Sequence, residues 1–270
     1  MGGNFLILTR MNYSTLHYTT ENRKAIVTLN RPEKRNALDD IMISELNDVF
    51  NSINRDQNIR IVIITGAEST FCAGMDLDYL KKFSQKEQTE NLEDARQFMK
   101  LLLTINGLKK PVIAMVNGPA LGGGCGIVAA CDFIFASKEK AKLGVPEVRL
   151  GFLPAIILVY LIKRMGEGAA REFVLRGDIL DASQAKDKGL VTEVVEDKSL
   201  KATVNAFADQ FASTTSASSI SLTKELFSRF NELEYKDALE YAANLNALTR
   251  KTDDFKKGIE SFLKKEKLQW

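Results

Sequence analysis

The glycine-rich segment at residues 121–126 (LGGGCG) is the first place in this 270-residue chain where the sequence suggests chemistry. It follows an apolar run at 112–116, typical of a buried strand, and precedes an alanine-rich, helix-like run at 127–132. A strand that turns on glycines into a helix leaves backbone N–H groups unpaired at the positive end of the helix dipole. Such a turn stabilises negative charge, either on a phosphate or on an oxyanion that exists only during a reaction.

A second segment of the same kind lies upstream. The apolar run at 61–65 leads to a small-residue loop at 71–77 (FCAGMDL) that enters a predicted helix. Two such loops can supply two N–H donors to one oxygen, which is the arrangement of an oxyanion hole. The chain lacks the glycine spacings of dinucleotide-binding and phosphate-binding loops, which argues against a phosphate cradle. The alternative is that the glycines only allow close packing of strand and helix.

Strands and helices that alternate along the chain must position these loops, and this alternation predicts an α/β fold. Strands are predicted at residues 25–29, 61–65, 112–116, 133–136, 142–144 and 190–195. Helices are predicted at residues 40–53, 77–83 and 92–108, with a polar, flap-like segment at 81–94. A capping-box spacing, Asp181 to Gln184, predicts a further helix that stops at Gly189.

From residue 199 onward the pattern becomes helical. Phenylalanines at helical spacing make these helices unusually apolar for a terminal segment, and we expect them to pack against a neighbouring subunit. They are Phe207, Phe211, Phe227, Phe230, Phe255 and Phe262.

Composition places the chain among ordinary globular proteins. Hydrophobic residues make up 45% and charged residues 27%, and the formal net charge is +2, so we expect no nucleic-acid and no membrane partner. Three cysteines without metal-ligand spacing suit a reducing compartment, and we expect a cytoplasmic protein without a metal site. The single histidine, His17, is expected to be an exposed strand residue. Residues 1–10 are expected to be a leader, with Met11 as the alternative start.

Four motifs together resemble the crotonase, or enoyl-CoA hydratase/isomerase, superfamily. They are residues 35–38 (RNAL), 71–76 (FCAGMD), 117–124 (NGPALGGG) and 146–151 (PEVRLG), and the resemblance runs from about Tyr13 to about Lys265. It implies a spiral of ββα units over residues 11–198 and a helical oligomerisation region over 199–270. It also implies a homotrimer or a hexamer built by that helical region.

The resemblance implies an acyl-CoA thioester as substrate, with coenzyme A bound as part of it and no other cofactor. Removal of a proton beside the thioester carbonyl places negative charge on its oxygen. The backbone N–H groups of Met75 and Gly123 match the two oxyanion donors of the family, and Gly123 is expected to be small so that the thioester can approach. Glu147 matches one of two glutamates that hydratases of the family use. Gly126 stands at the position of the other.

One glutamate is sufficient for an isomerase that takes a proton from C2 of a 3-enoyl thioester and returns it at C4. The apolar segment at 152–159 (FLPAIILV) suggests a hydrophobic acyl pocket. Considered alone, Glu147 could equally be an exposed residue or an ion-pair partner of Arg149. Glu167 is read as a charge at a helix N-terminus, and Asp76 as mainly structural. Alternatives are a hydratase, other enolate chemistry, or a non-catalytic protein that binds a CoA ligand or RNA.

The resemblance also implies where coenzyme A binds. The matching positions near its adenine and pantetheine are Arg35, Ala37, Leu38, Ala73 and Asp76. Phe262 and Lys265 match tail positions that reach the nucleotide, often from a neighbouring subunit. A solvated helix face is the alternative for this lysine-rich end.

Overall fold

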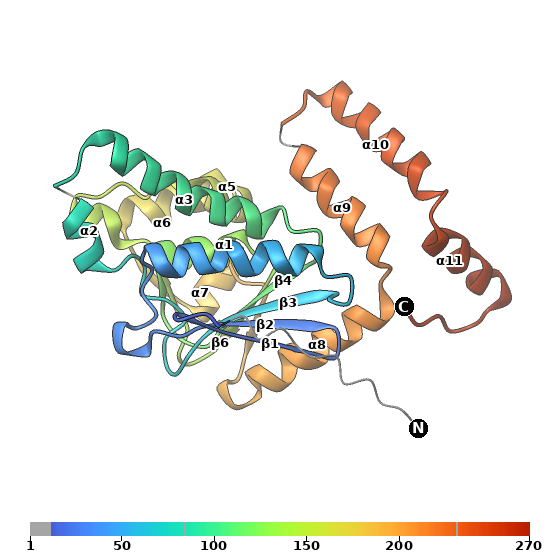
Figure 1. Ribbon diagram of the computed structural model, residues 1–270, viewed down its shortest axis with the longest axis horizontal. Helices are drawn as coiled ribbons and strands as arrows, with labels where there is room; N and C mark the ends of the chain where they lie inside the picture. The colour runs from blue at the N-terminus through green and yellow to red at the C-terminus, as the bar shows by residue number, and fades with distance from the viewer. Residues whose placement is uncertain (1–11, 84, 231) are drawn as a thin grey trace.

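The computed structural model describes residues 12–83, 85–230 and 232–270 (Figure 1). The predicted leader at 1–10 and the alternative start at Met11 lie outside these residues.

A six-stranded sheet forms the centre of the molecule, with strand order β1-β2-β3-β4-β6-β9. The strands are β1 (Leu16–Glu21), β2 (Lys24–Leu29), β3 (Ile61–Gly66), β4 (Val112–Val116), β6 (Phe133–Ser137) and β9 (Glu193–Val195). The first two pair antiparallel, and every later pair is parallel. Because the carboxyl ends of parallel strands meet at one edge, the loops that follow β3 and β4 emerge side by side.

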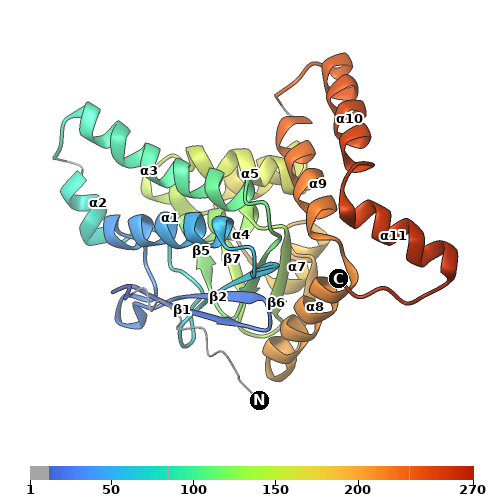
Figure 2. The ribbon, with the colours of Figure 1, turned by 45° about the vertical axis from the view of Figure 1, so that its right-hand side comes forward.

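Helices cover both faces of this sheet. On one face lie α1 (Asp40–Arg55) and α3 (Gln88–Asn106), and on the other lies α8 (Leu200–Thr214) (Figures 1 and 2). The sequence pattern of α1 explains its position: Asp39 accepts a hydrogen bond from the Met42 N–H at its start, and its apolar face is buried. With both faces covered, all six residues of β3 are buried.

A second, three-stranded sheet lies beside the glycine-rich turn. It consists of β5 (Ala120–Leu121), β7 (Lys142–Gly144) and β8 (Ile179–Asp181). The fully buried helix α4 (Gly123–Ala130) follows β5 directly, and the 3-10 turn η2 (Pro146–Leu150) follows β7. The remaining helices around it are α5 (Ala155–Met165), α6 (Glu167–Arg176) and α7 (Ala182–Asp187).

The predicted strand at 190–195 is too long. Only its last three residues form β9, because the N–H groups of Leu190 and Val191 both donate to the Ala185 carbonyl and close the end of α7. The capping box of α7 and the left-handed Gly189 after it are as predicted. The polar segment at 81–94, predicted as a flap, contains the end of α2 (Leu77–Phe83) and the start of α3.

The helical tail is confirmed, and two of its phenylalanines contact the core of the same chain. Phe207 and Phe211 on α8 are partly buried and pack edge-on against Phe133 at ring-centroid distances of 5.0 and 5.7 Å, so part of their aromatic surface is used inside the molecule. Packing of the rest of that surface against a neighbouring subunit stays a prediction. The helix that carries these two phenylalanines, α8, covers the sheet, whereas the helices that follow it lie away from the sheet.

Those later helices are α9 (Ala217–Phe230), α10 (Tyr235–Thr249) and α11 (Asp253–Lys264), and they stand away from the sheet (Figures 1 and 2). They expose large apolar side chains at Phe227, Phe230, Tyr235, Leu239, Leu248, Ile259, Phe262 and Leu263. Among the described residues, we find no helix with both the length and the apolar character needed to cross a membrane.

Candidate active site

Three short pairings bring the predicted motifs together. Leu38 pairs with Met75, Cys72 pairs with Ala120, and Leu121 pairs with Gly144. The loop after β3 is thereby held between the segment before α1 and strand β5. Because β5 and β7 run parallel, the segments that follow them lie next to each other, and η2 lies against the start of α4.

The N–H groups of Met75 and Gly123 have no acceptor among the described residues. In the Leu38–Met75 pairing, the Leu38 N–H donates to the Gly74 carbonyl and the Asp76 N–H donates to the Leu38 carbonyl, which leaves the Met75 N–H unused. Gly123 is the first residue of α4, where an N–H has no partner within the helix. A β-carbon placed on Gly74 would lie 3.7 Å from the Gly123 nitrogen, so the two donors lie close together.

Neighbouring side chains pack closely against Gly123 at the position where a β-carbon would lie. A β-carbon there would lie 3.1 Å from Leu38 Cδ1 and 3.3 Å from Phe98 Cζ. Packing within the protein therefore already requires a small residue at this position.

The Glu147 carboxylate faces the same turn. A β-carbon on Gly122 would lie 2.9 Å from Glu147 Oε1, and Gly122 has φ 49°, so only glycine suits this position. Glu147 Oε2 is buried and accepts no hydrogen bond from any residue that the structure describes. The ion-pair alternative is wrong, because Arg149 pairs with Asp178 instead, at 3.2 Å. Burial raises the pKa of Glu147 above its ordinary value, as a general base working near neutral pH requires.

A cavity of about 710 Å³ joins these groups. Ala73, Met75, Gly123 and Glu147 all line it, as do Leu77, Leu80, Phe83, Leu121, Leu150 and Phe152. Apolar side chains dominate this lining, but of the segment 152–159, from which a hydrophobic acyl pocket was predicted, only Phe152 lines it. Such a cavity beside two N–H donors and one base could hold a carbonyl compound while a proton is removed next to the carbonyl.

The site of the missing second glutamate is filled by an apolar side chain. A β-carbon on Gly126 would lie 2.2 Å from Ile157 Cγ2 and 3.1 Å from Ile157 Cβ. Ile157 is buried on α5, which packs against α4. Any side chain at position 126 must therefore displace a branched, stiff neighbour.

Only some of the residues predicted to bind coenzyme A lie near the cavity. Ala37 and Leu38 are buried beside Met75, and Arg35 is exposed at the end of η1 (Pro32–Lys34) with φ 52°. Phe262 and Lys265, at the end of α11, stand on the opposite side of the molecule from α2, which borders the cavity (Figure 2). The single chain does not bring them to the cavity.

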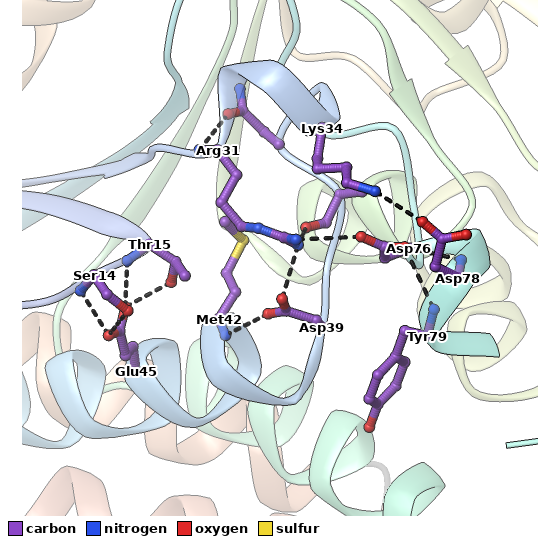
Figure 3. A network of polar contacts seen from close by, with 12 residues as sticks. Ser14, Thr15, Arg31, Lys34, Asp39, Met42, Glu45, Asp76, Asp78 and Tyr79 are labelled. Carbon is purple, nitrogen blue, oxygen red and sulfur yellow. Dashed lines mark hydrogen bonds and ion pairs between the residues drawn. The ribbon is translucent and has the colours of Figure 1, made fainter. Parts of the chain in front are cut away.

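Asp76 is structural, as expected. Its carboxylate accepts hydrogen bonds from the N–H groups of Asp78 and Tyr79 at the start of α2 and pairs with Arg31 (Figure 3). Burial acts to raise the pKa of Asp76, but those N–H groups, Lys34 and Arg31 outweigh it and lower the pKa. Glu167 begins α6 and pairs with Arg171, and His17 is an exposed strand residue, both as predicted.

Sequence reasoning missed one ionisable group of the cavity lining. Asp94 on α3 lines the cavity and accepts a hydrogen bond from the Tyr79 hydroxyl. Asp94 lies outside every motif, so only the fold of α3 over the glycine turn reveals it. The cysteines are poor candidates for a nucleophile, because burial raises the pKa of Cys72 and Cys125 to about 12.

Comparison with known proteins agrees with this geometry. A family model described as enoyl-CoA hydratase/isomerase matches residues 19–270. A Thermus thermophilus protein is 35% identical over 89% of this chain and 94% of its own. A Clostridium acetobutylicum protein named short-chain-enoyl-CoA hydratase is 33% identical, over 92% of this chain and 94% of its own. The crystal structure of a Mycobacterium smegmatis enoyl-CoA hydratase matches with a TM-score of 0.89 at 28% identity, covering 95% and 98% of the two chains. These likenesses confirm the predicted crotonase fold.

Proposed function

The chain belongs to the enoyl-CoA hydratase/isomerase family, and from this premise we propose that it isomerises an enoyl-CoA thioester through an enolate. Glu147 takes a proton from C2 of a 3-enoyl thioester, and the electron pair of that C–H bond moves toward the thioester oxygen. The N–H groups of Met75 and Gly123 hold the resulting negative charge. Glu147 then returns the proton at C4, which leaves the double bond between C2 and C3 and conserves every atom.

The observation that carries this proposal is the environment of Gly126. A hydratase of this kind positions water with two carboxylates, whereas Ile157 occupies the space that the second would need. The half-buried Glu147 carboxylate, whose buried Oε2 has no hydrogen-bond partner among the described residues, suits a base that both takes and returns one proton.

Hydration is the second candidate, and the names of the relatives favour it. In that reaction another group would have to assist Glu147 in activating water. Asp94 is the other carboxylate among the residues that line the cavity. We propose isomerisation as the main activity because Ile157 fills the space beside Gly126, while Tyr79 already donates a hydrogen bond to one oxygen of Asp94.

The packing around Gly126 makes the two activities separable by mutation. Gly126→Glu alone should lower the midpoint of thermal unfolding, since overpacking costs about 1–3 kcal/mol and the new carboxylate would be buried against Ile157. Gly126→Glu combined with Ile157→Ala removes the obstructing methyl groups and should raise hydration of 2-enoyl-CoA. Ile157→Ala alone is the control. No gain in hydration by a folded double variant would contradict the role assigned to this space.

For the coenzyme, we propose that Arg35 reaches a phosphate of coenzyme A and that Ala37, Leu38 and Ala73 flank its pantetheine. The Arg35 carbonyl accepts a hydrogen bond from the N–H of Ala73, which lines the cavity, and the exposed Arg35 guanidinium suits a phosphate. No other cofactor enters the proposed reaction. The cytoplasm is our proposed location, because the three cysteines are free thiols.

We further propose a homotrimer or hexamer built by the tail. Phe262 is 79% exposed and Leu263 is 74% exposed, an apolar end of α11 that a second copy of the chain would cover. In that assembly Phe262 and Lys265 lie near coenzyme A bound by a neighbouring subunit.

Introducing charge at this end of α11 should weaken assembly and coenzyme binding together. In the variant Phe262→Glu with Leu263→Glu, light scattering should report a smaller particle, and calorimetry should report weaker CoA binding. Glu266→Lys, an exposed charge change nearby, is the control. A monomeric wild type, or unchanged CoA affinity in the smaller particle, would contradict the shared role of α11.

A further inference from the structure

We propose that Arg31 orients and polarises the Met75 N–H through two peptide groups in series. This inference rests on the proposed function, in which that N–H holds the thioester oxygen. Arg31 lies between β2 and η1 and does not line the cavity, so its effect on the reaction would be indirect. It would be a positioning residue.

The first link in the series is a hydrogen bond to a backbone carbonyl. Arg31 Nη1 donates to the Ala37 carbonyl oxygen at 2.7 Å. The Ala37 carbonyl and the Leu38 N–H belong to one peptide group, which is planar and trans. The guanidinium therefore fixes the plane in which the Leu38 N–H lies.

The second link carries this orientation to the cavity. The Leu38 N–H donates to the Gly74 carbonyl at 2.8 Å, and the Gly74 carbonyl shares a planar peptide group with the Met75 N–H. In a trans peptide the carbonyl and the N–H point in opposite directions. Because the Gly74 carbonyl points at Leu38, the Met75 N–H points away from Leu38, on the side of the cavity.

The charge of Arg31 acts along the same path. A cationic donor on the Ala37 carbonyl makes the Leu38 N–H a stronger donor, and that bond in turn strengthens the Met75 N–H. Hydrogen bonds in a chain polarise one another by about 10–30% per bond in condensed-phase estimates. The effect is largest where water is excluded, and the Arg31 side chain is only 15% exposed.

Two carboxylates hold the guanidinium in place (Figure 3). Arg31 Nη1 lies 3.0 Å from Asp39 Oδ2, and Arg31 Nη2 lies 3.2 Å from Asp76 Oδ2. Each carboxylate also anchors the start of a helix, Asp39 that of α1 and Asp76 that of α2. The network therefore joins both sides of the Leu38–Met75 pairing to one largely buried cation.

A neighbouring ion pair provides a matched control. Lys34 pairs with Asp78 at 2.8 Å, and this pair joins the same two segments as the pair formed by Arg31 and Asp76 (Figure 3). The Lys34 and Asp78 side chains are 46% and 77% exposed, and the Lys34 ammonium donates to neither peptide group of the series. Lys34→Met should leave turnover unchanged.

The test separates the oxyanion from folding and from substrate binding. A 3-ketoacyl-CoA ionises at C2 to an enolate that absorbs in the near ultraviolet, so the apparent pKa of the bound compound reports how well the site holds negative charge. Arg31→Met should raise that pKa by about one unit, a tenfold loss of enolate stabilisation. It should also lower kcat roughly tenfold or more, with little change in KM. Arg31→Lys, which keeps the charge but not the planar fork, should fall between.

The contrary result is equally defined. If the activity lost in Arg31→Met only follows the fraction of folded protein, and the bound 3-ketoacyl-CoA ionises as in wild type, the residue is merely structural and the inference fails. Should Arg31→Met not fold, the same two measurements can be made on Arg31→Lys and on Asp76→Asn. A wild-type protein that neither ionises the 3-ketoacyl-CoA nor turns over any enoyl-CoA would instead refute the proposed function.

Discussion

Glu147→Gln is expected to lower kcat on an enoyl-CoA by about 10³-fold, within the range of 10²–10⁴ typical of general acid–base groups. Glutamine keeps the shape of the side chain but cannot accept the C2 proton. Steady-state rates measure the loss, and calorimetry should show that CoA-thioester binding is largely kept. Glu167→Gln, which removes an exposed carboxylate paired with Arg171, is the control and should leave the rate unchanged.

The pH profile adds a second reading of the same variant. The base works when ionised, so kcat/KM should rise with pH as Glu147 loses its proton. Because burial raises the pKa of Glu147, this rise should lie above the ordinary carboxyl pKa of about 4.3. It should be absent in Glu147→Gln.

The stability of the protein should fall with rising pH, whereas kcat/KM should rise. A carboxyl whose pKa is raised in the folded state binds its proton more tightly there than in the unfolded chain. The protein therefore loses stability as pH rises from the unfolded pKa through the folded pKa. Glu147→Gln removes this loss and should be at least as stable as wild type at neutral pH.

Full turnover by Glu147→Gln, together with loss of turnover in Asp94→Asn, would show that Asp94 and not Glu147 is the base.

Gly123→Pro is expected to lower turnover by at least ~100-fold, because loss of one oxyanion donor costs about 2.7–4 kcal/mol. Gly123 is the first residue of α4, a position where proline fits the helix and removes only an N–H that has no internal partner. The fold should therefore survive, which circular dichroism can check.

Gly123→Ala is the matched control for this substitution. It adds a β-carbon against Leu38 and Phe98 but keeps the N–H, so it measures crowding alone. A folded Gly123→Pro variant with the turnover of Gly123→Ala would show that this N–H does not hold the oxyanion.

The residues themselves were sufficient to predict that the two loops meet, because glycines mark where strands β3 and β4 end and the carboxyl ends of neighbouring parallel strands lie together. The place of Glu147 came from the family resemblance alone, since Glu147 follows β7 of the second sheet. Ile157 could not be predicted in the same way. It opposes Gly126 only because α5 folds back on α4, and an apolar residue in an apolar run carries no local sign of that contact.

Arg31 was missed for a related reason. Its hydrogen bond to the Ala37 carbonyl and its pairing with Asp76 depend on the turn at η1 and on the pairing of Leu38 with Met75. In the sequence, nothing distinguishes Arg31 from the many other charged residues. The phenylalanines of α8 show a different limit, because a wide apolar stripe predicts burial but does not say whether the covering surface is the same chain or another.

The most direct measurement of the central claim is the wild-type rate on matched 2-enoyl-CoA and 3-enoyl-CoA thioesters, followed by ultraviolet absorbance. Conversion of the 3-enoyl compound brings its double bond into conjugation with the thioester, so absorbance rises, whereas hydration of the 2-enoyl compound removes conjugation and absorbance falls. The single-glutamate site predicts that the rise is the faster reaction and that Glu147→Gln abolishes it. Hydration that is faster than isomerisation and survives in Glu147→Gln would contradict the account.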